Sequence, residues 1–530
     1  MRIRHHVAAA AIAFAVALPT AAPAQTATAQ TATAQTATAP IAVTRLGSYE
    51  TGIYNKSAAE IAAFDAGTKR LFVVNGAAEA IDILDIADPK APRMVGQVSL
   101  SAHGSGVNSV AAHGGLLAAA VTGAKKTDNG RVVFFRPDGT VLKTVEVGAL
   151  PDMVVFTPDG RYALTANEGE MDDEATVDPE GSISIIDLSG GIAGDTPVRT
   201  ADFRRFDGQP LPAGMRIGRR GNSFARDMEP ESIAVAPDGR TALVTLQENN
   251  AIAVVDIAAA TVTEVVGLGW IDRRRVPFDP SDRDGGPRIG TWPVFGMNQP
   301  DTIAAFQRNG ETFYVIANEG DSRDWKGFSE EKRVSELKLD PAAFPNAADL
   351  QKNDQIGRLR VTNQNGDTDG DGVFKELYTF GGRSFSVLDA RGRMVWDSGD
   401  AFERFIAERF PGQFNAGHTG NAADDRSDDK GPEPEGIAVV AVGGVPYAFV
   451  GLERFGGMFV YSLADPRAPA LVDYLTDRKF DGVPERGTAG DLGPEGMLVI
   501  PADQSPTGQV LLVVTNEVSG NTAIFEVRAR

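Results

Sequence analysis

One short unit recurs along the sequence, and this repeat constrains the fold more than any other feature. A proline and an acid open the unit, an alternating apolar run follows, a turn containing glycine reverses the chain, and a second apolar run ends beside another acid. The clearest copies begin at Pro151-Asp152 and Pro230-Glu231. Further copies open at Pro300-Asp301, Pro434-Glu435 and Pro494-Glu495, with two diverged copies near Ser57 and Gly106. The sequence therefore contains seven related units.

Each unit supplies three or four short β-rich strands with almost no helical periodicity, which is typical of an all-β repeat. Blades of four strands arranged radially would cover one another's faces and protect the sheet edges. We therefore predict a seven-bladed β-propeller, with an array of β-sandwiches as the alternative. The last unit has only three clear strands, and the isolated strand Ile41 to Glu50 is predicted to complete it and close the ring.

The fifth unit is much longer than the others, because 134 residues separate Pro300 from Pro434. We predict an insertion at about 320–433 that contains one amphipathic helix, Ala401 to Phe410, and otherwise extended surface loop. Loops of this kind often build functional sites.

The N-terminus has the pattern of a secretory signal peptide: two arginines, an uncharged run of about twelve residues and Ala22-Pro23-Ala24. The run is too short to span a bilayer, so we expect no transmembrane segment after cleavage and a periplasmic or secreted protein. The predicted organisation is a signal peptide at 1–24, a low-complexity linker at 25–40 and the propeller at 41–530.

The composition is acidic and contains no cysteine. The formal net charge is −20, and it becomes −22 when the signal peptide removes two arginines. Such a protein repels nucleic acid and anionic membranes and attracts cations. Without thiolates, any metal ion must bind to oxygen or imidazole ligands.

The hairpin in each unit brings its two acids together. Because the chain reverses, Asp152 at the start of one strand and Glu168 at the end of the next lie at the same edge. If the first strand of each unit is innermost, its leading residue faces the mouth of a central channel. The seven leading residues are Glu60, Asn108, Asp152, Glu231, Asp301, Glu435 and Glu495, and six are carboxylates. A second tier comprises Asn75, Thr122, Glu168, Glu248, Glu319, Glu453 and Glu517.

Such a ring of acids is electrostatically unfavourable by itself. Two carboxylates about 5 Å apart at an effective dielectric near 20 repel by roughly 3 kcal/mol. Either some acids stay protonated or they bind cations, and hard divalent metals favour oxygen ligands. We therefore predict that the six leading acids are metal ligands; the alternative is that they are separate, solvent-exposed turn residues.

Two loops ahead of these acids add cations and a histidine. Glu229-Pro230-Glu231 follows Arg226, and Glu433-Pro434-Glu435 follows Lys430. Each cation is a candidate catalytic residue that would stabilise a phosphate, or else a member of a loop salt bridge. His418 precedes the second loop and is a candidate metal ligand or acid/base, with a solvent-facing histidine as the alternative.

Asp367, Asp369 and Asp371 match the D-x-D-x-D-G start of a calcium loop, although the twelfth position is Tyr378 rather than glutamate. We predict a structural calcium ion in the insertion. The sequence has no Gly-x-Ser-x-Gly, Walker or dinucleotide-binding motif.

Several motifs resemble those of the choice-of-anchor I domain family, often labelled alkaline phosphatase or phytase-like. They are Ala-Asn-Glu-Gly-Asp-Ser-Arg-Asp-Trp at 317–325, Gly-Asp-Thr-Asp-Gly-Asp-Gly at 366–372, Gly-Gly-Arg-Ser-Phe-Ser at 381–386 and Ser-Asp-Asp-Lys-Gly-Pro-Glu-Pro-Glu-Gly at 427–436. The sequence is more distantly similar to propeller-type haloalkyl phosphotriesterases, whose channel holds two metal ions, typically manganese. This resemblance implies that Glu231, His418, Glu435 and Glu495 are ligands.

These observations favour a metal-dependent hydrolase of a small phosphoester. In this hypothesis two calcium or manganese ions lie in the channel and activate water, and Arg226 or Lys430 stabilises the developing charge. One alternative is a non-catalytic, calcium-stabilised surface or periplasmic propeller that binds a partner. Another is a lactonase or esterase propeller.

Overall fold

The computed structural model describes residues 41–530. The predicted signal peptide and linker lie outside this range. Seven four-stranded sheets dominate the described residues, and within each sheet neighbouring strands are antiparallel. In six of these sheets the strands follow chain order, which is the arrangement that successive hairpins produce.

The strands of these six sheets have the following bounds: β2 (Ala62–Asp65), β3 (Arg70–Asn75), β4 (Ala80–Asp85) and β5 (Arg93–Ser99); β6 (Gly106–His113), β7 (Leu116–Thr122), β8 (Asn129–Phe135) and β9 (Val141–Ala149); β10 (Pro151–Phe156), β11 (Tyr162–Asn167), β12 (Ser182–Asp187) and β13 (Val198–Asp202); β14 (Pro230–Val235), β15 (Thr241–Leu246), β16 (Ala251–Asp256) and β17 (Thr261–Gly267); β20 (Ile303–Arg308), β21 (Glu311–Asn318), β29 (Ser384–Asp389) and β30 (Met394–Asp397); and β31 (Pro434–Val442), β32 (Val445–Leu452), β33 (Met458–Ser462) and β34 (Ala470–Leu475).

The remaining four-stranded sheet joins the two ends of the described chain. It contains β35 (Pro494–Ile500), β36 (Val510–Asn516), β37 (Asn521–Ala529) and β1 (Ile41–Glu50), and β1 pairs antiparallel with β37 from Ile41 opposite Ala529 to Glu50 opposite Asn521. The N-terminal strand thus pairs with the last strand of the chain, as the sequence predicts.

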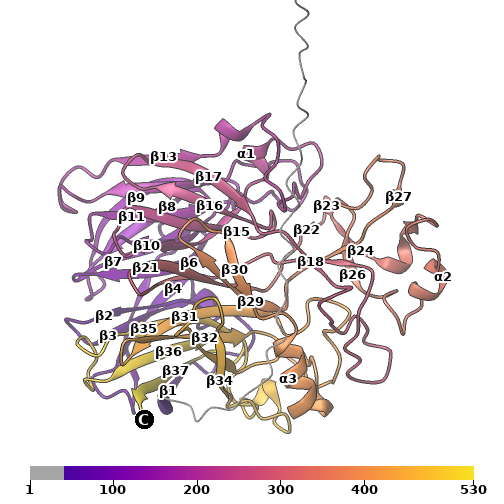
Figure 1. Ribbon diagram of the computed structural model, residues 1–530. Helices are drawn as coiled ribbons and strands as arrows, with labels where there is room; N and C mark the ends of the chain where they lie inside the picture. Colours follow the sequence, from indigo (N-terminus) through magenta and orange to yellow (C-terminus); the bar gives the residue numbers. More distant parts are fainter. Residues whose placement is uncertain (1–40) are drawn as a thin grey trace, which may run out of the picture.

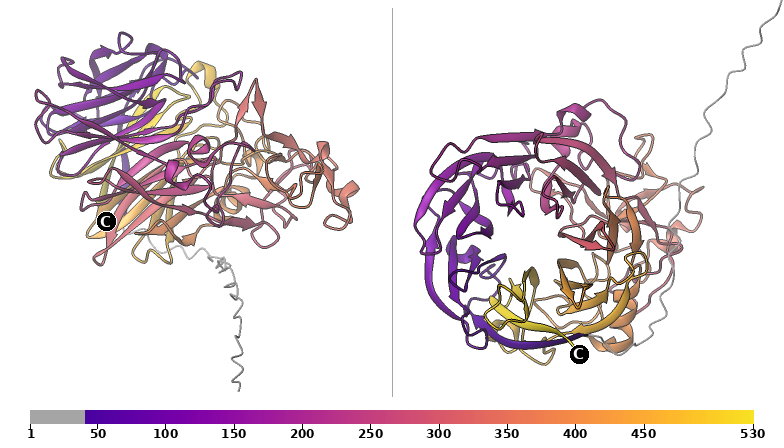
Figure 2. Two further views of the ribbon diagram at one scale, coloured as in Figure 1. Left: turned by 90° about the horizontal axis from the view of Figure 1, so that it is seen from above. Right: turned by 60° about the vertical axis from the view of Figure 1, so that its left-hand side comes forward.

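The sheets stand in a ring around a common axis (Figure 2). Buried apolar side chains fill the space between consecutive sheets. For example, Leu164 of β11 and Val244 of β15 belong to one core, and Leu243 of β15 and Ile316 of β21 belong to the next. The two faces of β15 therefore serve two different cores, since successive side chains on a strand alternate in direction. The prediction of an all-β propeller is confirmed.

The long fifth unit forms a separate subdomain at one side of the ring (Figure 1). Its strands are short: β18 (Trp270–Asp272), β19 (Phe295–Met297), β22 (Asp324–Trp325), β23 (Phe328–Ser329), β24 (Glu331–Arg333), β25 (Lys338–Leu339), β26 (Arg360–Thr362), β27 (Val373–Phe374) and β28 (Tyr378–Thr379). It has its own apolar core, to which Phe278, Val334 and Leu359 belong. Residues from about 270, upstream of the predicted insertion, therefore also contribute to it.

Helices are few and short. They are α1 (Phe224–Asp227), α2 (Ala347–Leu350) and α3 (Ala401–Arg409), with 3-10 turns at Gly76–Ala78, Arg204–Phe206, Val334–Glu336, Pro411–Gln413 and Pro484–Arg486. The predicted amphipathic helix corresponds to α3, whose Phe402 and Ile406 are buried against β33 residues such as Phe459. Within residues 41–530, no helix has the length and apolar character needed to cross a membrane.

Candidate metal centre

Irregular strand starts position the leading acids. Pro151 pairs with Asn167, yet regular pairing resumes only at Met153 opposite Ala166, so Asp152 lies at a β-bulge. The same shift follows Pro230, Pro434 and Pro494. A bulge turns a side chain away from the regular alternation of its strand. The repeated bulge therefore presents Asp152, Glu231, Glu435 and Glu495 in the same way.

The residue before the proline is also unusual in three of the units. Leu150, Gln299 and Glu433 have φ angles of 47°, 48° and 50°. This left-handed conformation is rarely adopted by residues other than glycine and is often found at functional sites. It turns the chain so that the carbonyl groups of Leu150 and Glu433 accept hydrogen bonds from the backbone N–H groups of Glu168 and Glu453, each at 2.8 Å.

The two tiers of acids converge. Oxygen atoms of Asp301, Glu319 and Glu435 all lie within 4.8 Å of one another, although these residues come from two different sheets. A second group of this kind contains Glu319, Glu433 and Glu453. Glu435 of the first tier and Glu319 of the second, which are 116 positions apart in the sequence, therefore face the same space.

The other leading acids face the same axis. Burial, together with the nearby Glu517 and Asp152, raises the pKa of Glu60 to about 8, although a hydrogen bond from Ser57 lowers it. Burial and Asp152 likewise raise the pKa of Asp301 to about 7. Burial, Glu60 and Glu517 raise the pKa of Glu495. These leading acids of separate repeat units thus influence one another, as the hairpin register predicts.

Several of these carboxylates have an oxygen atom with no hydrogen-bond donor. The buried, unpaired atoms are the Oε2 atoms of Glu231, Glu248, Glu435, Glu453 and Glu495. Glu248 and Glu453 are only 4% and 5% exposed. Buried carboxylate oxygens almost always have partners, and hard divalent cations bind such atoms. The ligand set therefore fits calcium or manganese.

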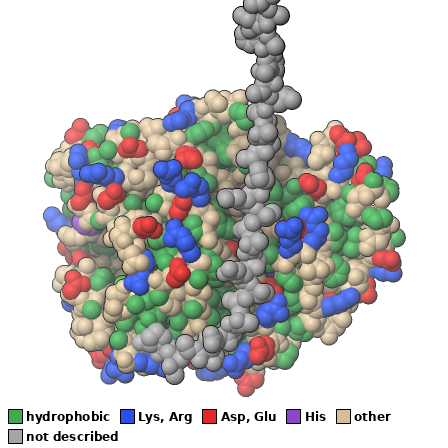
Figure 3. All heavy atoms as spheres, viewed as in Figure 1, with side chains coloured by type: hydrophobic (Ala, Val, Ile, Leu, Met, Phe, Trp, Pro, Cys, Tyr) green, Lys and Arg blue, Asp and Glu red, His purple; other side chains and the backbone are tan. Residues whose placement is uncertain are grey.

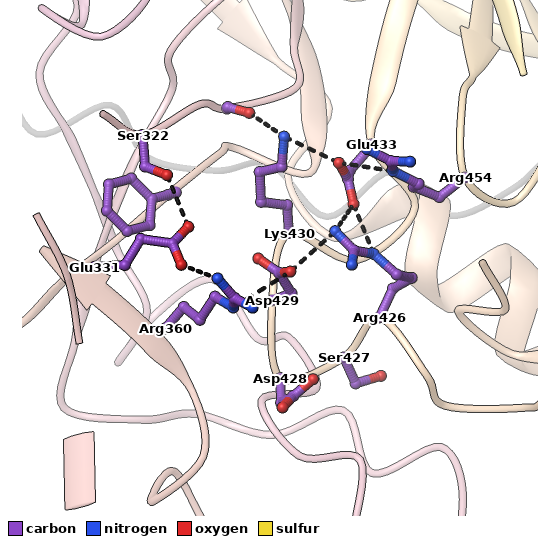
Figure 4. Close-up of polar contacts among 12 residues, drawn as sticks. Ser322, Glu331, Arg360, Arg426, Ser427, Asp428, Asp429, Lys430, Glu433 and Arg454 are labelled. Atoms are coloured by element: carbon purple, nitrogen blue, oxygen red, sulfur yellow. Dashed lines mark hydrogen bonds and ion pairs between the residues drawn. The ribbon is translucent and has the colours of Figure 1, made fainter. Parts of the chain in front are cut away.

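Glu433 contacts three positively charged side chains beside the acids (Figure 4). Its Oε1 atom lies 2.6 Å from Arg426 Nη2, and its Oε2 atom lies 3.0 Å from Lys430 Nζ and 3.2 Å from Arg454 Nε. Burial opposes ionisation of Glu433, but Lys430, Arg426 and Arg454 outweigh this effect and hold its pKa below the usual range.

The two basic side chains predicted to be catalytic, Lys430 and Arg226, have different environments. Lys430 reaches the acids, but its Nζ atom also lies 2.8 Å from Glu319 Oε1, so this lysine belongs to the salt bridges given as the alternative. Arg226 lies on α1 with an exposed side chain, and the structure does not bring it to the acids. The buried Arg323 instead pairs with the first Glu-Pro-Glu, its Nη2 atom 2.8 Å from Glu229 Oε2. The motif at 317–325 contains Arg323, but the spacing gave no sign of this long-range contact.

His418 reaches the channel mouth. Its Nδ1 atom lies 3.2 Å from Glu453 Oε1 and 3.9 Å from Glu517 Oε1, and these three residues form a further group with ligand atoms within 4.8 Å. Arg454 Nη1 lies 2.6 Å from His418 Nε2. The same Nη1 atom lies 3.1 Å from Nδ1, so Arg454 and Glu453 both contact the imidazole ring.

A cavity of about 570 Å³ extends along the axis from the acids. Asp152, Asp301 and Glu495 line one part of it, and side chains of the innermost strands line the rest, among them Val110 and Met497. Because the acids border an open cavity, a small molecule could reach them.

The calcium-like loop of the insertion has the predicted convergence. Asp367, Asp369 and Asp371 place oxygen atoms within 4.8 Å of one another. Asp367 accepts hydrogen bonds from the backbone of Gly370 and Gly372 at 2.8 and 3.2 Å, and Asp369 pairs with Lys375. Calcium in this loop remains a prediction.

Comparisons with known proteins identify related sequences. The family model described as the choice-of-anchor I domain matches residues 60–466. Gigasin-3a of Magallana gigas is 35% identical over 196 residues, which cover 34% of this chain and 67% of that protein. The mesenchyme-specific cell surface glycoprotein of Strongylocentrotus purpuratus is 29% identical over 289 residues, covering 48% of this chain and only 37% of that protein.

Among solved structures, the chain is similar to Kuenenia stuttgartiensis hydrazine synthase. The TM-score is 0.46 and the sequence identity 14%, and the match covers 90% of this chain and 99% of that chain. The β-propeller domain of Myceliophteria thermophila Cps50 (Swd1) gives a TM-score of 0.44 and 8% identity, with coverage of 92% and 99%.

Proposed function

The chain belongs to the choice-of-anchor I domain family, and from this premise we propose that it is a secreted or cell-surface propeller that holds divalent cations at its axis and binds a partner without catalysis. The observation that carries the proposal is the group of buried carboxylates with unpaired oxygen atoms, to which Glu435 and Glu453 belong. The relative from Strongylocentrotus purpuratus is named a cell surface glycoprotein, and neither relative's name denotes an enzyme.

We also infer that the seven four-stranded sheets are seven blades of one ring and that β1 closes it. Apolar cores between consecutive sheets support this reading. The last of them joins the β35–β37 sheet to the β2–β5 sheet, through contacts among residues such as Val513 and Leu71. Bound cations would tie the blades together at the axis, because their ligands come from different sheets.

Calorimetric titration of the chelator-treated protein with Ca²⁺ or Mn²⁺ tests the cation site. Glu435→Gln keeps the shape of the side chain but removes a charge, so we expect at least about tenfold weaker binding, equivalent to about 1.4 kcal/mol. Glu408→Gln, at an exposed position of α3, is the matched control and should bind as the unmodified protein does. Equal affinity in both variants would contradict the proposal.

A metal-dependent phosphoester hydrolase is the second candidate. The observation that favours it is the position of His418 and Arg454 beside Glu453. Asp152, Asp301 and Glu495 also line a cavity of about 570 Å³ that a small substrate could enter. Bound metal would supply an activated water, and His418 would move a proton. A lactonase or esterase would use the same groups.

The release of phosphate or an aryl alcohol from model mono-, di- and triesters separates the two candidates. The assay uses chelator-treated protein with Ca²⁺ or Mn²⁺ restored. A hydrolase should lose turnover in His418→Ala while still folding, and Arg226→Ala, which lies away from the acids, should retain it. The absence of turnover with every metal would exclude this candidate and leave the binding function.

A further inference from the structure

A second acidic cluster lies outside the channel, where the subdomain meets the loop that carries His418. Oxygen atoms of Asp279, Asp284 and Asp424 lie within 4.8 Å of one another. Asp279 is fully buried and Asp424 is 5% exposed. No lysine, arginine or histidine nitrogen in residues 41–530 lies within salt-bridge distance of any of the three.

Two loops bring these aspartates together. The loop of residues 279–289 is closed by a bridge between Phe278 and Gly290, and Asp279 accepts a hydrogen bond from the backbone of Ser281 at 3.2 Å. Gly285 and Gly286, with φ angles of 96° and 133°, follow Asp284 and allow the chain to turn back there. Asp279 and Asp284 are therefore held on one compact loop.

The buried guanidinium of Arg383 joins this loop to the second one. Its Nη1 atom donates to the backbone carbonyl of Asp279 at 2.8 Å, and its Nη2 atom donates to the carbonyls of Ser427 and Asp429 at 2.8 and 2.7 Å. Ser427 Oγ in turn donates to Asp424 at 2.6 Å. The charge of Arg383 is already matched by Glu403, whose Oε1 atom lies 2.6 Å from Nη1. Arg383 therefore leaves the three aspartates without an ion pair, although the backbone N–H groups of Ser281 and Arg288 donate to Asp279.

Asp284 provides an independent sign of a ligand. Both of its carboxylate oxygens are shielded from solvent, and neither has a hydrogen-bond donor. A carboxylate that is buried without any donor is costly, because it has lost its hydration without replacement. Asp284 forms the group of three acids together with Asp279 and Asp424, so its unpaired oxygen atoms lie where a bound cation would be.

We propose that Asp279, Asp284 and Asp424 bind a divalent cation, with calcium as the best match, and that this ion clips the loop of residues 415–433 to the subdomain. Calcium accepts six to eight oxygen ligands, and backbone carbonyls and water would complete the three carboxylates. The clipped loop carries His418, Lys430 and Glu433, so the ion fixes the loop that supplies groups to the channel mouth. The proposal does not depend on an ion in the channel.

Calcium content after dialysis, measured by elemental analysis, tests this site. Asp284→Asn should retain one calcium ion fewer per chain than the unmodified protein. Asp354→Asn, an exposed acid of the same subdomain, is the matched control and should retain the full number. Glu435→Gln should retain the calcium ion bound by Asp279, Asp284 and Asp424. Loss of this ion is therefore distinguishable from loss of binding in the channel.

Hydrogen exchange of the unmodified protein gives a test that requires no variant. Calcium should slow exchange at residues 279–290 and 415–429 by at least tenfold relative to chelator. Two results would overturn the proposal: no calcium effect on either segment, or an Asp284→Asn protein that retains all its calcium and melts at a higher temperature with and without the ion. The second result would mean that the aspartates share protons instead.

Discussion

Glu433 joins segments around the channel mouth through three ion pairs. Its carboxylate is fully buried and contacts Arg426, Lys430 and Arg454. Glu433→Gln should destabilise the protein by about 3–5 kcal/mol, because it leaves buried cations without their counter-charge. Denaturant unfolding in saturating calcium measures this.

The control is Glu180→Gln, which removes the partly exposed partner of the exposed Arg204 and should cost less than about 1 kcal/mol. Equal effects of the two substitutions would show that Glu433 does not organise the loops.

The sequence was informative about single residues only where their position follows from local geometry. Hairpin reversal predicts Asp152 beside the channel, and the position of His418 shortly before Glu433-Pro434-Glu435 made it a candidate there. The partners of Lys430 and Arg323 come from distant segments of the chain; Lys430 and Glu319, for example, are 111 positions apart. No periodicity encodes these contacts, so the salt bridges of Lys430 and the role of Arg323 became visible only in the structure.

Among the elements, the strands could be predicted well because alternating apolar residues and Pro-Asp-Gly turns define each hairpin. The bulges after Pro151, Pro230, Pro434 and Pro494 could not, because a bulge depends on how the two strands pair. The subdomain was predicted only in part, since the strands from Trp270 to Met297 join it through β28, far along the chain.

Strand β1 allows a test of ring closure. A chain that begins at residue 51 leaves one edge of β37 without a partner strand and uncovers apolar residues such as Leu512, which share a core with Ile41. We expect it to unfold at a lower temperature and to aggregate, because an unpaired strand edge associates with other chains. Melting and light scattering should distinguish it from a chain that begins at residue 41. Identical melting of the two chains would contradict closure by β1.

At the scale of the whole molecule, charge is distributed unevenly. On the face shown in Figure 3, acidic and basic side chains are interspersed, whereas the axis gathers carboxylates. Burial and neighbouring acids raise the pKa of Glu60 to about 8 and that of Asp301 to about 7, above their ordinary values of 4.5 and 3.8.

This difference predicts how stability depends on pH. If the pKa of a carboxyl group is higher in the folded than in the unfolded protein, its contribution to stability is fully present below the unfolded-state pKa. This contribution is lost as the pH rises through the folded-state pKa. The chelated protein should therefore lose stability between about pH 4 and pH 8 because of these groups. Calcium should oppose the loss by stabilising the ionised form. Melting temperatures measured across this range with chelator or calcium check both statements, and a calcium effect that does not grow with pH would contradict them.

The most direct measurement is anomalous scattering from crystals of the protein soaked in Mn²⁺. The account predicts a peak among Asp301, Glu319 and Glu435 that disappears in Glu435→Gln. Ordered carboxylates at this position with no anomalous peak, at manganese concentrations that fill other sites of the crystal, would contradict the claim that these acids converge to hold a metal ion.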